Sequence, residues 1–339
     1  MTRRPINVLV VLDGLFTTCS GPGTIKALKM SAVDCTIHAA APDPGYGALY
    51  LADRVAVCAG GDGFFPWLID YCREHRIDVV LCDASDFIGI AAHRADLERA
   101  SGARMLVQPE AVIAIAENKL RTGRWLDENG FAHPAFAPGD DAEAVAALVR
   151  DHGYPLIAKP YVGKGSSGMA IIRNHEDLAR ATQRPDMLIQ QHVGTDDTEY
   201  TVNCFVDRDG KVRGLFSFRR RLWMGMSVHC VVDRNESVLA LAEAIAVAIG
   251  ARGSTNIQLR LHDGVAVCLE VNARFSGTTA MRASLGYNDL EHAFAHYVFD
   301  EPATSLPVIT EGVALRYVEE IYPATLAEQS SANPLQPDR

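Results

Sequence analysis

Three oxygen-bearing side chains near the C-terminal end of the chain have the spacing of a cation site. Gln258 lies in one apolar run, and Glu270 and Asn272 lie in the next, with Asp263-Gly264 between the runs. Asp-Gly in this position predicts a hairpin, because the pair suits a tight turn. Alternation along the strands then puts Glu270 and Asn272 on one face, where Gln258 can meet them. Carboxylate and amide oxygens bind Mg²⁺, so we predict a magnesium site; the alternative is a solvated strand face.

Segments upstream have features that suit a phosphate-bearing ligand. The loop Gly163–Gly168 joins two predicted strands, and its amides and hydroxyls could contact phosphate oxygens. It does not match the P-loop pattern, because a glycine follows its lysine and a strand follows the loop. Lys159 ends a buried-looking strand, where a lysine without an anionic partner would be costly. Arg274 lies just beyond the predicted metal ligands, in a position to contact a phosphate held by the metal.

Other polar residues are ambiguous on their own. Lys119 stands near the start of a predicted helix, where most lysines are solvated. The segment 188–194 leaves a strand, and its backbone groups could bind an adenine edge. Arg219 and Arg221 end a strand-like run and are either carboxylate or phosphate contacts or a solvated strand end. Further candidates for lining a substrate pocket are Asp83, Ser85, Ser276 and Gly277.

Composition limits the classes of partner and compartment. The 339 residues are enough for two or three domains. The net charge of −10 argues against nucleic acid or an anionic membrane as the main partner. The eight cysteines are scattered without a Cys-x-x-Cys pair, so neither a zinc site nor a disulfide framework is expected. The N-terminal residues lack the apolar core of a signal peptide, and we expect a cytoplasmic protein with no membrane partner.

The pattern of elements changes about one third of the way along the chain. The first 115 residues or so alternate strand and helix patterns, which predicts an α/β segment with an open, mostly parallel sheet. From about residue 131, several strands follow one another with hairpin signals such as Asp209-Gly210. This second pattern of elements predicts an α+β segment. The cation-site residues and the glycine-rich loop therefore belong to the second segment.

Taken together, the motifs resemble those of the ATP-grasp enzymes, and most closely the branch related to the carbamoyl-phosphate synthetase large subunit. The resemblance rests on the order of these motifs along the chain: Lys119, Lys159-Pro160, Gly163–Gly168, Gln190-Gln191-His192-Val193, Glu199-Tyr200-Thr201-Val202, Gln258 and Glu270-Val271-Asn272-Ala273-Arg274. It extends from about residue 6 to 320. It implies a pre-ATP-grasp α/β domain over 1–117, an ATP-grasp domain over 118–320 with a small lid subdomain at about 131–195, and a C-terminal tail over 321–339.

The resemblance also implies a role for each of these residues. The phosphates of ATP would be held by Lys119 and Lys159 and covered by a lid loop of Gly163, Lys164, Gly165, Ser166, Ser167 and Gly168. The nucleoside would be held by Gln190, by the backbone of Gln191 and Val193, and by Glu199 at the ribose. Mg²⁺ would be held by Gln258, Glu270 and Asn272, with Arg274 stabilising the transferred phosphoryl group. Arg219 and Arg221 match an Arg-x-Arg that this branch often has.

The activity implied is that of an ATP-dependent carboxylate–amine ligase. ATP would convert a carboxylate to an acyl phosphate, and an amine would then displace phosphate. One alternative is phosphorylation of a carboxylate or carbamate without ligation, and another is a non-catalytic nucleotide sensor. A nicotinamide-dependent oxidoreductase is a further alternative, suggested by Ser20-Gly21-Pro22-Gly23. Lys26 stands where the dinucleotide pattern needs its third glycine, so a substrate-facing loop is favoured there. The expected partners are a small carboxylate and an amine, and the sequence is compatible with a homodimer.

Overall fold

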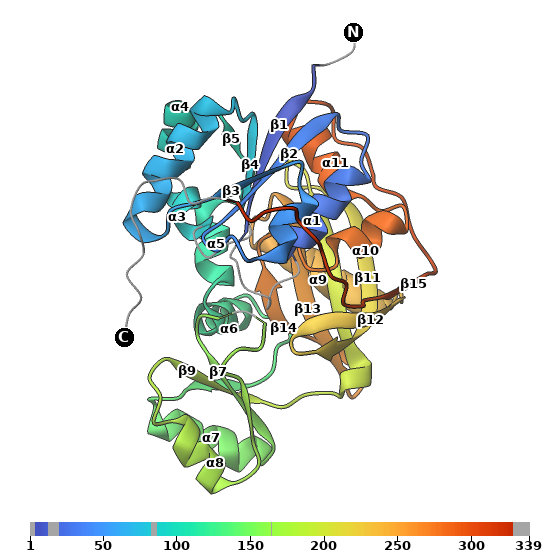
Figure 1. Ribbon diagram of the computed structural model, residues 1–339. Helices are drawn as coiled ribbons and strands as arrows, with labels where there is room; N and C mark the ends of the chain where they lie inside the picture. The colour runs from blue at the N-terminus through green and yellow to red at the C-terminus, as the bar shows by residue number, and fades with distance from the viewer. Residues whose placement is uncertain (1–3, 13–19, 83–86, 164, 328–339) are drawn as a thin grey trace.

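Three β-sheets, one after another along the chain, organise the molecule (Figure 1). The structure is a computed structural model, and it describes residues 4–12, 20–82, 87–163 and 165–327. The first sheet is parallel, and the second and third are antiparallel. The expected fold is therefore confirmed: an open parallel α/β sheet is followed by an α+β segment. Among the described residues, every helix is too short or too polar to span a lipid bilayer.

The N-terminal sheet has five parallel strands in the order β3-β2-β1-β4-β5. Its strands are β1 (Ile6–Val11), β2 (Cys35–Ala41), β3 (Arg54–Val57), β4 (Val79–Cys82) and β5 (Arg104–Met105). Its helices are α1 (Ser20–Lys29), α2 (Phe64–Glu74), α3 (Phe87–Ala92) and α4 (Arg94–Ser101), with short 3-10 turns η1 (Gly47–Leu51) and η2 (Gly61–Gly63). The central strand β1 is almost wholly apolar, because a parallel strand covered on both faces has no solvated side.

A small four-stranded sheet forms the lobe at the bottom of Figure 1. Its strands, in the order β6-β9-β7-β8, are β6 (Phe136–Pro138), β7 (Leu156–Pro160), β8 (Ala170–Ile172) and β9 (Met187–Gln191). Helices α7 (Ala142–His152) and α8 (His175–Ala181) contribute to its own small core. The glycine-rich loop connects β7 to β8. This lobe occupies the stretch for which a lid was predicted.

The third sheet has six strands in the order β14-β13-β10-β11-β12-β15. They are β10 (Glu199–Val206), β11 (Val212–Trp223), β12 (Met226–Val232), β13 (Gly253–His262), β14 (Val265–Asn272) and β15 (Val313–Leu315). Around it lie η3 (Asp196–Thr198), α9 (Glu236–Ala248), α10 (Thr279–Ser284), α11 (Asp289–Ala293) and the π-helical turn η4 (Phe294–Val298). The predicted hairpin is present: Asp263 and Gly264 have φ values of 49° and 81°, as a type I′ turn requires.

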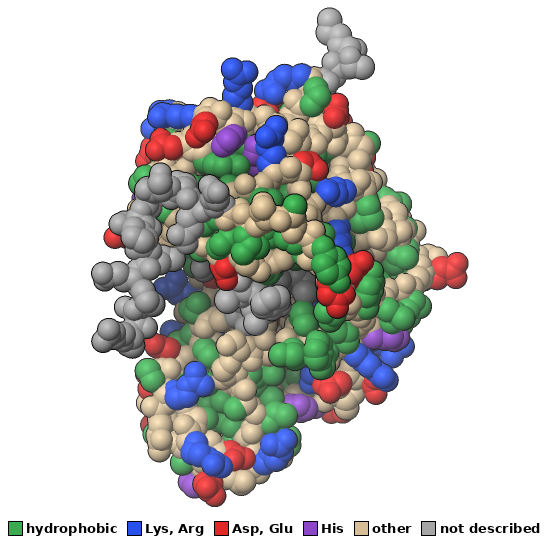
Figure 2. All heavy atoms as spheres, in the orientation of Figure 1, with side chains coloured by type: hydrophobic (Ala, Val, Ile, Leu, Met, Phe, Trp, Pro, Cys, Tyr) green, Lys and Arg blue, Asp and Glu red, His purple; other side chains and the backbone are tan. Residues whose placement is uncertain are grey.

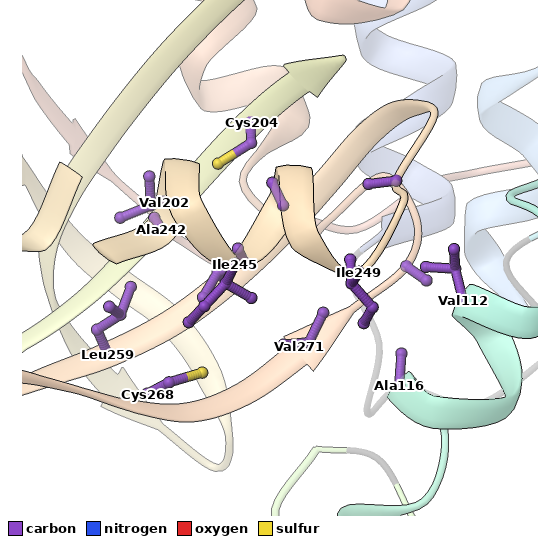
Figure 3. Close-up of a cluster of buried hydrophobic side chains, with 14 of the residues drawn as sticks. Val112, Ala116, Val202, Cys204, Ala242, Ile245, Ile249, Leu259, Cys268 and Val271 are labelled. Carbon is purple, nitrogen blue, oxygen red and sulfur yellow. The ribbon is translucent and has the colours of Figure 1, made fainter. Parts of the chain in front are cut away.

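Helix α9 packs against one face of the third sheet, and the predicted cation ligands lie on the opposite face. Figure 3 shows Ala242, Ile245 and Ile249 of the α9 region packed against strand side chains, with Val112 and Ala116 of α5 (Glu110–Ala116) beside them. Helix α5 precedes the predicted domain boundary at 117, yet it packs into this core and is followed by α6 (Lys119–Glu128). The apolar side chains thus fix the sheet from one side.

The surface carries charges of both signs. On the face shown in Figure 2, acidic and basic side chains are interspersed. Ala327, at the end of the described chain, donates from its backbone amide to the Tyr50 hydroxyl at 3.1 Å. The first part of the predicted tail therefore lies against the N-terminal domain, and residues 328–339 are outside the described part of the chain.

Candidate active site

The three predicted cation ligands come together on the face of the third sheet opposite α9. Gln258 of β13 and Glu270 of β14 are direct register partners, and Asn272 pairs with Asn256. A β-bulge follows Gln258, so that Leu269 on β14 has no partner of its own. The bulge reverses the alternation of β14. Glu270 and Asn272 consequently face the site, although a regular strand would put Glu270 on the same face as the buried Cys268.

Two lysines lie near the bulge and Glu270. The Leu269 carbonyl accepts a hydrogen bond from Lys159 Nζ at 3.4 Å. Lys119 Nζ lies 3.3 Å from Glu270 Oε1 and donates to the Gly163 carbonyl at 2.8 Å. Lys119 can reach both groups because it is the first residue of α6, where the Asn118 side chain caps the helix. Helix α6, strand β7 and strand β14 thus meet at one carboxylate.

Burial and charge together shift the acid–base behaviour of this cluster. Burial lowers the pKa of Lys159 to about 8; Glu270 opposes that shift and Lys119 adds to it. Burial by itself would raise the pKa of Glu270, but the charges of Lys119, Lys159 and Arg274 outweigh it and hold that pKa below its usual value. The carboxylate is therefore ionised at neutral pH, as a cation ligand must be.

Arg274 links the cation site to the N-terminal domain. Its Nη2 donates to Asn272 Oδ1, and its Nη1 donates to Ser20 Oγ, both at 3.2 Å. Two atoms here are buried without a hydrogen-bond partner in the described part of the protein: Arg274 Nε and Asn272 Nδ2. Buried donors without acceptors are costly, which suits a site built to receive an oxygen-rich ligand. Ser20 begins α1, so the segment predicted to face a substrate does reach this site.

The glycine-rich loop lies against the far end of the site. Gly165 packs so tightly on the β11–β12 turn that a Cβ on Gly225 would come within 2.5 Å of the Gly165 carbonyl. Ser166 and Gly168 have φ values of 60° and 72°, and Ser167 lies between them. Lys164 is outside the described residues. The loop therefore contacts the β11–β12 turn through Gly165 and Gly225. A side chain at Gly225 would force the loop or the turn to move.

These elements enclose a cavity of about 100 Å³, here called the cation-site cavity. Its wall includes Gln258, Glu270, Asn272, Arg274, Lys119, Gly163, Gly165, Ser276 and Gly277 from the predicted set. Ser20, from the segment predicted to face a substrate, also lines it, as do residues for which no site role was predicted, namely Glu117, Thr201, Arg220, Asn256, Ser227, Thr278 and Arg316. Four cationic side chains in this wall face two carboxylates, so the cavity favours an anion. The unpredicted residues come from strands and helices far apart in the sequence.

The residues expected to hold a nucleoside lie outside this cavity wall. Gln190 is buried in β9, and the Gln191 side chain accepts from the Ala135 amide at 3.3 Å. The Val193 carbonyl accepts from Arg260 at 3.2 Å. Glu199 is buried and its two oxygens bind Arg220 and Arg260 at 2.9 and 2.8 Å. A ribose at Glu199 would have to share those oxygens with both guanidinium groups.

The three consecutive arginines of β11 alternate between the two faces of the strand. Arg219 pairs with Asp233 at 3.2 Å and Arg221 pairs with Asp197 at 2.8 Å, both at exposed positions outside the cavity wall. Arg220 lies between them, is buried, and lines the cation-site cavity. The Arg-x-Arg pattern therefore did not lead to the residue that faces the site. Asp83 and Ser85 are outside the described residues.

Comparison with known proteins accounts for this combination of sheets and loop. Residues 183–321 match the family model described as "ATP-grasp in the biosynthetic pathway with Ter operon". Residues 128–208 match the "Carbamoyl-phosphate synthase L chain, ATP binding domain". Together the two matches run from residue 128 to residue 321, and over this stretch the chain is similar to ATP-grasp proteins. The two matches overlap and cover the glycine-rich loop, the third sheet and the cation-site residues.

Sequence relatives and solved structures extend the ATP-grasp likeness over different lengths. The carbamoyl phosphate synthase large chain of Thermomicrobium roseum is 30% identical over 201 residues, which are 54% of this chain and 18% of the relative. The chain thus spans less than a fifth of that relative's length. N5-carboxyaminoimidazole synthetase from Staphylococcus aureus, solved with ADP, has a TM-score of 0.70 at 12% identity, covering 93% of this chain and 82% of that one.

A second solved structure of similar fold is a ligase for amino acids. L-amino acid ligase from Bacillus licheniformis has a TM-score of 0.63 at 16% identity, covering 87% of this chain and 74% of that one. At these identities the structural likeness establishes the fold. The N-terminal parallel sheet, the small lobe and the six-stranded sheet together have the fold of these solved structures.

Proposed function

We propose that this protein is an ATP-dependent carboxylate–amine ligase that acts through an acyl phosphate. The observation that carries the proposal is the convergence of Glu270, Gln258 and Asn272 with Lys119 and Lys159 in one closed region. A single carboxylate with two amides suits Mg²⁺, which keeps much of its shell for water and substrate phosphates. Bound there, Mg²⁺ would neutralise charge on the phosphates of ATP.

The protein's own residues would do the rest by position and charge. Lys119 and Lys159 would contact the phosphates, and the loop Gly163–Gly168 would cover them and exclude water. Arg274 would stabilise the phosphoryl group during transfer, because its buried Nε has no other acceptor among the described residues. A carboxylate oxygen of the substrate attacks the γ-phosphorus and the bond to ADP breaks.

In the second step, an amine nitrogen attacks the acyl carbon. Phosphate leaves with its bonding electron pair and the nitrogen loses a proton, which gives an amide, ADP and phosphate. Similarity to carbamoyl phosphate synthases and structural likeness to an L-amino acid ligase support this class of reaction. Gln190, Gln191, Val193 and Glu199 remain the proposed nucleoside contacts, reached once the small lobe and the third sheet hold ATP between them.

The test is a screen of carboxylate and amine pairs for ATP-dependent phosphate release, followed by mass analysis of the products. A product joined by an amide bond, formed with Mg-ATP and lost in Glu270→Ala, supports the proposal. Hydroxylamine trapping of an acyl phosphate in reactions that give no amide would indicate phosphorylation without ligation. Thermal stabilisation by NAD(P) but not by Mg-ATP would overturn the proposal in favour of an oxidoreductase.

A further inference from the structure

A second and larger cavity lies where the N-terminal sheet meets the third sheet. Its volume is about 290 Å³, at the lower end of the range for small-molecule sites. Val10, Leu81 and Leu106, at the carboxyl ends of β1 and β4 and just after β5, line one side. Gly253 and Ser254, at the start of β13, line the other. This space, here called the interface cavity, is a place where open α/β sheets commonly bind ligands.

The wall of the interface cavity is mostly apolar, and its charged side chains are arginines. Most of its lining residues are apolar, including Phe87, Val107 and Phe275. The wall also contains four arginines, Arg94, Arg208, Arg252 and Arg274, and no Asp or Glu among the described residues. A mostly apolar wall with four arginines suits a molecule that has an apolar body and an anionic group.

The arginines are not all equally free to bind an anion. Arg208 pairs with Asp300 and lies over the Tyr297 ring at 5.4 Å, and Arg94 pairs with Glu98 at 3.1 Å. For Arg252, the described residues provide no carboxylate within ion-pair distance. Its Nη1 donates only to the carbonyls of Gly250 and Ala251, at 3.3 and 2.7 Å. At this end of the cavity, Arg252 therefore has no carboxylate partner among the described residues.

Arg208 and Arg252 lie at the same end of the third sheet. Val206, the last residue of β10, pairs with Gly253, the first residue of β13. Arg208 follows that pair on one strand, Arg252 precedes it on the other, and both line the interface cavity. An anionic group at this end of the cavity would have both arginines in its wall, and arginines bind carboxylates.

The two cavities meet at Arg274, which lines both of them. Strand β13 also runs from one to the other: Ser254 lines the interface cavity, and Asn256 and Gln258 line the cation-site cavity. A molecule seated in the interface cavity would therefore have one end at Arg252 and the other near the predicted phosphoryl group. The shared residue Arg274 therefore distinguishes the reacting end of the interface cavity from its Arg252 end.

We propose that the interface cavity binds the second substrate of the ligase, and that this substrate has an apolar body and a carboxylate held by Arg252 and Arg208. Its reacting end then lies at Arg274. The inference rests on the proposed function for the role of substrate. The binding site itself stands on the cavity and its arginines, and it is tested without any turnover.

The test uses linear carboxylates from acetate to octanoate as probes, with the alcohols of equal length, in isothermal titration calorimetry. Each added methylene should lower the Kd about fourfold until the cavity is filled, as burial of a CH₂ predicts. Each acid should bind at least about tenfold more tightly than its alcohol, because only the acid makes a charge-assisted contact. Equal binding of acid and alcohol, or no binding by any acid, would overturn the proposal.

Matched variants assign the site to this cavity. Arg252→Gln keeps a donor for the Gly250 and Ala251 carbonyls but removes the charge, so it should lose the preference for acid over alcohol and keep the chain-length dependence. Arg252→Lys should restore part of the preference. Arg221→Gln, at an exposed ion pair outside both cavities, should behave as the wild type. An unchanged preference in Arg252→Gln would contradict the assignment.

Mg-ATP titrations keep the two proposals apart. All three variants should bind Mg-ATP with the wild-type Kd, since none of these residues lies in the cation-site cavity. Acid binding that responds to Arg252 without any Mg-ATP binding would overturn the ligase function and leave the carboxylate site. Mg-ATP binding and phosphate release with no acid preference would leave the function and overturn the carboxylate site.

Discussion

The two cavities on either side of Arg274 are built in opposite ways. In the cation-site cavity, Glu270 already pairs with Lys119, and Asn272 already accepts a hydrogen bond from Arg274. In the interface cavity, the wall is apolar and Arg252 has no carboxylate partner among the described residues. In the proposed function, Mg²⁺ and the phosphates of ATP would take the place of the Lys119–Glu270 pair. In the proposed carboxylate site, Arg252 would bind an anionic group without first losing a carboxylate partner from the described residues.

A buried ion pair holds the loop that follows Arg274, the residue shared by the two cavities. Arg282 is 1% exposed and binds both oxygens of Asp289 at 2.8 Å. Arg282 also donates to the hydroxyls of Ser276, Thr278 and Thr279, the loop that follows Arg274. The loop thus owes its conformation to a charge that neither substrate would touch.

Breaking that ion pair should have the largest effect of all, and it should affect both cavities at once. Arg282→Met leaves Asp289 charged and buried, with the Asn203 amide as a remaining side-chain donor among the described residues. Loss of one partner of a buried pair costs about 3–5 kcal/mol. Urea unfolding measures this loss. Arg180→Met, which removes an exposed partner of Asp177, should cost less than about 1 kcal/mol, and equal costs would show that burial does not matter here.

Removing the charge of Glu270 should impair the cation-site cavity and leave ligand binding in the interface cavity almost unchanged. Glu270→Gln keeps the size of the side chain and removes the carboxylate, so ATP-dependent phosphate release should fall about 10²–10³-fold, the size expected for several kcal/mol of lost electrostatic stabilisation. Binding of hexanoate to the interface cavity should change less than about twofold, because Glu270 does not line that cavity. A parallel loss of hexanoate binding would mean that the two cavities are one site.

The sequence predicted which residues come together around Glu270 better than it predicted the rest of the pocket wall. Gln258, Glu270 and Asn272 lie on two strands joined by one tight turn, so the hairpin signal brings them close, and alternation puts Glu270 and Asn272 on one face. Arg220 could not be chosen over Arg219 and Arg221, because the facing of β11 depends on its register with β10 and β12. Strand alternation alone also would not have shown the bulge at Leu269 that makes Glu270 face the site.

Long-range partners were harder still to predict. Ser20 reaches Arg274 across 254 positions of sequence, which no local pattern encodes. The interface cavity is made by the meeting of two sheets and was not predicted at all. The parallel first sheet and the antiparallel later sheets were predicted, because their hydrophobic patterns and turn residues are local. Local pattern thus determined the elements, and packing between them determined most of the pocket.

Closure of the glycine-rich loop gives a smaller effect with a closely matched control. Gly225 and Gly264 both follow a residue with positive φ in a tight hairpin turn, at φ values of 75° and 81°. An alanine at either position meets the same left-handed strain, about 1 kcal/mol. A Cβ at Gly225 also collides with Gly165, whereas one at Gly264 meets nothing within 4 Å.

Gly225→Ala should therefore raise the KM for ATP about tenfold, while Gly264→Ala should leave it unchanged and both lose similar stability. Steady-state phosphate release and thermal unfolding of the two variants measure this difference. Hexanoate binding should be the same in both, because the loop does not line the interface cavity. If both alanine variants raise the KM equally, the loop–turn contact has no role in holding ATP.

The smallest expected signal is a fraction of a proton taken up when Mg-ATP binds. The pKa of Lys159 is lowered to about 8 by burial, with Lys119 adding to the shift and Glu270 opposing it. A bound polyanion favours the charged lysine and raises that pKa, so binding at pH 8 should take up about half a proton. Uptake should fall to near zero at pH 6, where Lys159 is already protonated, and affinity should weaken as pH rises through 8. Calorimetry in two buffers of different ionisation enthalpy measures the uptake. Lys159→Arg keeps the charge but cannot titrate, and the same uptake in that variant would assign the proton to another group.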